Sequence, residues 1–147
     1  MSCPFGGVLV GSKNIVSRTR YYKQMLGEGF RQAGYLAACG IYALQHMVDR
    51  LAEDHDNAKL LAKGLIELGM EVDLDSVQTN MVYFNVPLSL MDADEFSKKI
   101  NSYKGIKTNA PNKNRIRLVT HYGITKDDVE YFLSKVKDTM NNYTFTN

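Results

Sequence analysis

Cysteine is scarce in this chain of 147 residues: only Cys3 and Cys39 occur, and they do not form a CxxC motif. A disulfide-rich secreted scaffold is therefore excluded, and the spacing does not suggest a cysteine-ligated zinc site. We expect a reducing, cytoplasmic environment in which both thiols are small, buried side chains.

An excess of charge and a long apolar run are also missing. The formal net charge is +2, and lysine and arginine are spread along the chain, so the composition does not indicate a nucleic-acid partner. Apolar runs stay short of the roughly 18 residues that a membrane-spanning helix needs, so no membrane partner is expected. The N-terminus lacks the charged segment that begins a signal peptide.

The remaining composition, 44% hydrophobic and 23% charged, is typical of a folded domain with a real core. Helical patterns dominate the first part, and from about residue 70 the order is strand, strand, helix, strand, helix. That order predicts helices packed on a small sheet. The expected helices cover 13–26, 31–51, 52–69, 95–103 and 126–140, and the expected strands cover 7–10, 70–74, 79–86 and 115–120.

The stretch NRIRLVTH, residues 114–121, reads as a strand with arginines in it. Side chains alternate between faces, so Arg115, Arg117 and Val119 share one face. Two interpretations stay open: a solvated face of an antiparallel sheet, or an anion site, since a guanidinium matches a carboxylate with two parallel hydrogen bonds.

A second arginine, Arg31 in LGEGFRQAG, leaves a similar choice. The glycines either end one helix and start the next, or Arg31 near a helix N-terminus helps to bind an anion such as phosphate. His46, His55 and His121 are too dispersed for a metal site, and none is predicted.

Four ordered motifs give the chain a family resemblance: MLGEGFRQAG, MVDRLAEDHDNAK, TNMV and IRLVTH. From about Cys3 to Met140 the sequence resembles the C-terminal half of the low-specificity L-threonine aldolases. These are lyases dependent on pyridoxal 5'-phosphate (PLP), with the α/β PLP-transferase-like fold of type I. The resemblance implies that residues 1–48 complete a large PLP-binding domain and residues 49–140 form a small α+β domain. Residues 141–147 are expected to be a disordered tail.

The resemblance also assigns roles to the arginines. It implies that Arg117 binds the α-carboxylate of the amino-acid substrate, and that Arg31 lies near the cofactor phosphate across a dimer. Arg115 receives no role and is expected to be solvated. The family's Schiff-base lysine would precede Met1 by about two residues, so we expect no catalytic residue in this chain and no covalent binding of PLP to it.

Two functions follow from the resemblance. The chain is either the C-terminal portion of a homo-oligomeric lyase that cleaves L-threonine or L-allo-threonine to glycine and acetaldehyde, or a truncated, inactive relative that serves as an assembly domain. An in-frame serine-lysine-glycine run upstream of Met1 in the gene would favour the first. In either case we expect the chain alone to be inactive.

Overall fold

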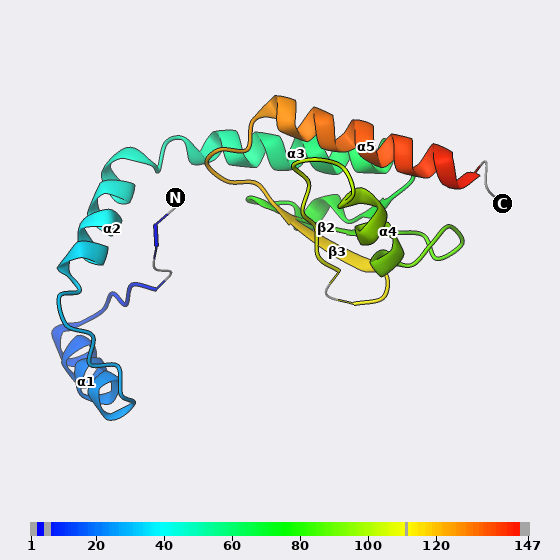
Figure 1. Cartoon of the computed structure of the whole chain (residues 1–147). Helices are drawn as coiled ribbons and strands as arrows, with labels where there is room; N and C mark the ends of the chain where they lie inside the picture. Colours follow the sequence, from blue (N-terminus) through cyan, green and yellow to red (C-terminus); the bar gives the residue numbers. More distant parts are fainter. Residues whose placement is uncertain (1–2, 5–6, 111, 145–147) are drawn as a thin grey trace. The chain divides into compact units, whose positions relative to one another are not determined.

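The computed structural model describes residues 3–4, 7–110 and 112–144. The chain divides into two compact units, Met1–Asp49 and Arg50–Asn147, which we call unit 1 and unit 2. Figure 1 shows their elements along the chain, and each unit is described by itself.

Unit 1 contains two helices, α1 (Lys13–Met25) and α2 (Gly34–His46). Ser12 is the N-cap of α1, and its hydroxyl accepts a hydrogen bond from the backbone N–H of Ile15 at 3.4 Å. The expected strand at 7–10 is wrong. Its backbone is irregular and Val8, Leu9 and Val10 are exposed, because a strand needs a pairing partner and the described part of the chain offers none.

The expected long helix over 31–51 is also wrong, because α2 ends at His46 and α3 (Leu51–Glu67) begins after a turn. The turn contains neither glycine nor proline, so the sequence carried no signal for it. The division into two units falls at this turn, between Asp49 and Arg50.

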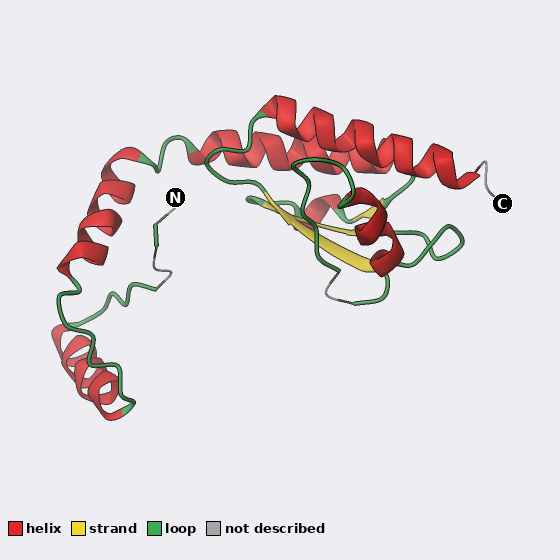
Figure 2. Ribbon diagram, in the orientation of Figure 1, coloured by secondary structure: helices red, strands yellow, loops and turns green. Residues whose placement is uncertain are grey.

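Unit 2 is built on a three-stranded antiparallel sheet in the order β1-β2-β3. Its strands are β1 (Glu71–Val72), β2 (Met81–Asn85) and β3 (Arg115–Val119), and a short 3-10 turn, η1 (Leu74–Ser76), follows β1. The helices α3, α4 (Ala93–Ile100) and α5 (Lys126–Thr144) pack with this sheet (Figure 2).

The alternation predicted for the strands is confirmed. Val82 and Phe84 of β2 and Ile116 of β3 are buried. The two arginines that flank Ile116 in β3 are exposed. One face of the sheet therefore contacts the helices and the other is open. In the core, Phe84 meets Phe96 of α4 edge to face, with ring centroids 5.9 Å apart.

Both ends of the last helix are defined in the structure. A capping box opens α5, because Thr125 and Asp128 exchange hydrogen bonds of 2.8 and 3.2 Å. The expected disordered tail is corrected in part: residues 141–144 belong to α5, and 145–147 lie outside the described residues.

The cysteines also differ from expectation, since Cys3 is half-buried and Cys39 is exposed on α2. Cys39 is exposed because α2 buries only Ala43. Within the described residues, no helix combines the length and apolar character needed to cross a membrane.

Candidate functional site: the open face of the sheet

The open face of the sheet displays the side chains that alternate with the core residues of β2 and β3. Antiparallel pairing places Tyr83 directly opposite Arg117 and Asn85 opposite Arg115. Arg115 therefore lies diagonally across from Tyr83, within reach of its ring. Two guanidinium groups and one aromatic ring thus share a small exposed area.

The two arginines differ in what they contact. The guanidinium carbon of Arg115 lies 4.6 Å from the centre of the Tyr83 ring, a cation–π contact. Arg115 was expected to be merely solvated; it is exposed but stacked. The side chain of Arg117, by contrast, makes no hydrogen bond, ion pair or ring contact with any described residue. Its guanidinium donors are free for an external anion.

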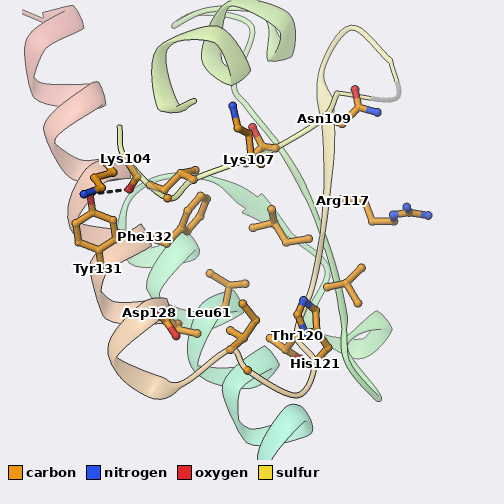
Figure 3. Close-up of a pocket in the computed structure, with 18 residues that line it drawn as sticks. Leu61, Lys104, Lys107, Asn109, Arg117, Thr120, His121, Asp128, Tyr131 and Phe132 are labelled. Carbon is orange, nitrogen blue, oxygen red and sulfur yellow. Dashed lines mark hydrogen bonds between the residues drawn. The ribbon is translucent and has the colours of Figure 1, made fainter. Parts of the chain in front are cut away.

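A hollow of about 680 Å³ lies beside β3, between the start of α5 and the loop at 104–109. Arg117 is one of the residues that line this hollow, but Figure 3 shows that its side chain points away from Leu61 and Phe132, which line it as well. Two lysines that line the hollow, Lys104 and Lys107, point in different directions from each other. The candidate site is therefore the open sheet face and not the hollow.

The end of β3 is attached to α3 by a buried hydroxyl. Thr120, only 2% exposed, donates from Oγ1 to the carbonyl oxygen of Asp54 at 2.6 Å. Its backbone N–H donates to the carbonyl of Asn80 at 2.9 Å, and its own carbonyl accepts from Asn80 Nδ2 at 2.7 Å. The hydroxyl also makes a longer contact of 3.3 Å with the Asn80 carbonyl oxygen, and together these bonds fix the residue that follows β3 to two other segments.

Asp54 is itself held by an arginine. Its carboxylate, 1% exposed, accepts from both terminal nitrogens of Arg50, at 2.9 and 3.2 Å. Arg50 lies 5.1 Å from the centre of the Tyr122 ring. The hydrogen bond to Asp54 is the main reason that the pKa of Arg50 is raised, so this guanidinium stays charged. A buried carboxylate is thereby paired, as burial requires.

These contacts bring together residues from three of the four motifs that carry the family resemblance. MVDRLAEDHDNAK contributes Arg50 and Asp54, TNMV contributes Asn80, and IRLVTH contributes Thr120. Sequence reasoning assigned no role to these four residues. The motifs marked these segments as similar to the family. The hydrogen bonds between the segments are visible only in the fold.

The other predicted site residue, Arg31, lies in unit 1, whereas Arg117 lies in unit 2. Arg31 is exposed and precedes α2, whose N-cap, Ala33, has no side-chain hydrogen bond. The neighbouring Gln32 has a φ of 51°, the only positive φ among the described non-glycine residues. Free backbone N–H groups beside a guanidinium suit an anion such as phosphate.

Comparison with known proteins assigns the chain to a family. The profile of the beta-eliminating lyases matches residues 1–87. The chain belongs to the beta-eliminating lyase family. It is 37% identical over 142 residues to the "Low-specificity L-threonine aldolase 1" of Arabidopsis thaliana, covering 95% of this chain and 39% of that protein. It is 36% identical over 130 residues to the "Low specificity L-threonine aldolase" of Escherichia coli K12, covering 88% and 37%.

The expected resemblance to low-specificity threonine aldolases is therefore confirmed. This chain spans less than two fifths of the length of these relatives.

Solved structures support the fold. A NifS-like protein superposes with a TM-score of 0.62 at 17% identity, over 73% of this chain and 32% of that chain. A chain in the complex of SepCysS with the N-terminal domain of SepCysE gives 0.55 at 18%, over 74% and 31%. With the family match, these similarities confirm the expected α/β PLP-transferase-like fold of type I.

Proposed function

We propose that this chain is the C-terminal part of a PLP-dependent lyase that cleaves L-threonine or L-allo-threonine to glycine and acetaldehyde. Membership of the beta-eliminating lyases and the names of the two aldolases support the reaction class. In this proposal residues 1–48 complete a large PLP-binding domain, and residues 49–140 form the small domain.

The observation that carries the proposal is the free guanidinium of Arg117. It lies on an open sheet face, it lacks a partner among the described residues, and its neighbour Arg115 is occupied by Tyr83. Among common side chains, arginine alone offers a planar fork that matches both oxygens of a carboxylate. An α-amino acid presents such a carboxylate, so Arg117 would hold and orient the substrate.

The residues present fit the anionic group of the cofactor. Arg31, together with the uncapped N-terminus of α2, would hold the phosphate of PLP. When bound, PLP supplies an electron sink for cleavage of the carbon–carbon bond. In this proposal no lysine of this chain holds PLP covalently. We further propose a homo-oligomer, a dimer or tetramer, in the cytoplasm.

The test is Arg117→Lys in a complete subunit, made by joining this chain to the N-terminal part of the Arabidopsis aldolase. Lysine keeps the charge but loses the planar fork. Loss of one charge-assisted hydrogen bond costs roughly 1.5–3 kcal/mol, so kcat/KM for threonine is expected to fall about tenfold to a hundredfold. Much of the loss should appear in KM, because the carboxylate is held in the ground state and the transition state alike.

Arg115→Lys is the matched control on the same strand face. Lysine can also stack on Tyr83, so steady-state kinetics should change little. A damaging Arg115→Lys beside a mild Arg117→Lys would reassign the carboxylate to Arg115. If both substitutions were silent, the face would be only a solvated surface and the proposal would fail.

A further inference from the structure

The hydrogen bonds around Thr120 fix the strand that carries Arg117. Thr120 lies three positions after Arg117, where β3 leaves the sheet. Its N–H and carbonyl both bond to Asn80, and its hydroxyl reaches the backbone of Asp54 in the first turn of α3. We call Thr120, Asn80 and Asp54, with their hydrogen bonds, the β3 anchor.

The anchor is rigid at each of its points of attachment. Asn80 directly precedes β2, which pairs with β3 along its whole length. Asp54 lies in α3, and Arg50 holds its carboxylate through two hydrogen bonds. Both Thr120 and Asp54 are almost completely buried, so water does not compete for these bonds.

Core packing alone does not call for a threonine at position 120. Valine has nearly the same shape and would fill the same space, but it lacks the hydroxyl group. A threonine hydroxyl buried at this point costs desolvation unless it is bonded, and here it makes a short, directed bond of 2.6 Å. The threonine side chain therefore fills the space, and its hydrogen bond also sets where the end of β3 lies along α3.

We propose that Thr120 is a positioning residue for Arg117: its hydroxyl holds the end of β3 on α3, so that the Arg117 guanidinium is presented at a fixed place for a substrate carboxylate. The proposal rests on the proposed function, in which Arg117 binds that carboxylate. Displacing a binding group by about 1 Å can lower the reaction rate about a hundredfold. Loss of the β3 anchor should therefore have a measurable effect on substrate binding.

A double-mutant cycle in the complete subunit tests the proposal. Thr120→Val should raise KM for threonine about tenfold and change kcat less, because a misplaced guanidinium weakens substrate binding first. Thr120→Ser keeps the hydroxyl and should remain within about twofold of the wild type. In the Arg117→Lys background, Thr120→Val should add less than about twofold, since the group on which it acts is already altered.

Val136→Ala separates positioning from general loss of stability. Val136 is fully buried in α5, remote in sequence from β3, and its truncation weakens the core without touching the anchor. KM measured well below the unfolding temperature should stay at the wild-type value. An equal rise in KM for Val136→Ala and Thr120→Val would overturn the positioning role.

Amide hydrogen exchange on the 147-residue chain supplies a readout that does not depend on activity. Thr120→Val should speed exchange at Leu118 to Thr120 relative to Thr120→Ser, because the hydroxyl bond to α3 is lost. Unchanged exchange would overturn the anchor itself. If exchange rises and Arg117→Lys is kinetically silent, the anchor stands but the proposed function fails, and with it the positioning role. If Thr120→Val raises KM equally in the Arg117→Lys background, the proposed function survives and Thr120 does not act through Arg117.

Discussion

At the scale of single residues, alternation along β3 predicts the face of each arginine but not its partner. Ile116 is buried and Arg115 and Arg117 are exposed, as the period of two requires. The stacking of Arg115 on Tyr83 depends on the register between β2 and β3, which is set by the connection through α4 and by the core. The sequence alone does not give the register between the two strands. The resemblance therefore pointed to Arg117, and the structure showed that its side chain has no partner among the described residues.

Asn57 gives a prediction at the same scale. Its side-chain amide donates to the carbonyl of Ile124 at 3.0 Å and so attaches the loop before α5 to α3. In Asn57→Asp a carboxylate would face that carbonyl without a proton to donate. Unfolding free energy at pH 7 should fall by roughly 1–3 kcal/mol, the cost of an unsatisfied, half-buried polar group.

The pH dependence of that variant has a definite sign. Below about pH 4 an aspartate side chain takes up a proton and can donate again, so part of the lost stability should return. Asn57→Ala, which has no group to protonate, should show no such recovery relative to the wild type. Urea unfolding at pH 3.5 and pH 7 measures both, and equal losses for Asn57→Asp at the two pH values would contradict this account.

At the scale of elements, unit 2 follows its sequence closely, whereas unit 1 does so only in α1. The strands β2 and β3 and the helices α4 and α5 were predicted because each buries one face within unit 2 and carries the matching period. Residues 7–10 have strand-like composition but lack pairing, and the turn after His46 has no breaker residue. A strand-like pattern is realised only where a pairing partner is present, whereas α1 forms with no buried residue because its cap and its own backbone hydrogen bonds suffice.

The capping box of α5 offers the prediction for an element. The pKa of Asp128 is lowered, chiefly because the Thr125 backbone N–H donates to its carboxylate and the Thr125 hydroxyl does so as well. A lowered pKa in the folded state means that the contribution to stability is present above the ordinary value of 3.8 and is lost as the pH falls through the lowered value.

Asp128→Ala should therefore reduce the melting temperature at pH 7, and the gap to the wild type should narrow as the pH falls below 3.8. Glu130→Ala, an exposed change in the same helix beyond the cap, is the control and should have a smaller effect at pH 7. Circular dichroism melts between pH 3 and pH 7 give the comparison. A gap that widened in acid would reverse the assigned role of the carboxylate.

At the scale of the whole molecule, the two units differ in how much apolar surface they bury. Unit 2 holds an extended core on one face of its sheet, whereas Ala43 is the only buried hydrophobic residue among the described part of unit 1. Large side chains of unit 1 such as Phe30, Tyr35, Ile41 and Leu44 are exposed. The chain spans less than two fifths of the length of the relatives it matches. Apolar side chains exposed in such a cluster are typical of a surface that contacts other protein.

The isolated chain should consequently self-associate through unit 1. Exposed apolar side chains on α2 lose contact with water when two chains meet, and each large one contributes to association. Ile41→Glu places a charge on this surface and should lower the apparent mass in light scattering at a given concentration. Gln45→Glu adds the same charge to an exposed polar position of the same helix and should change the mass much less. If the two substitutions acted alike, net charge and not the apolar surface would govern association, and if the wild-type chain stayed monomeric at all concentrations, the exposed face of α2 would need no partner.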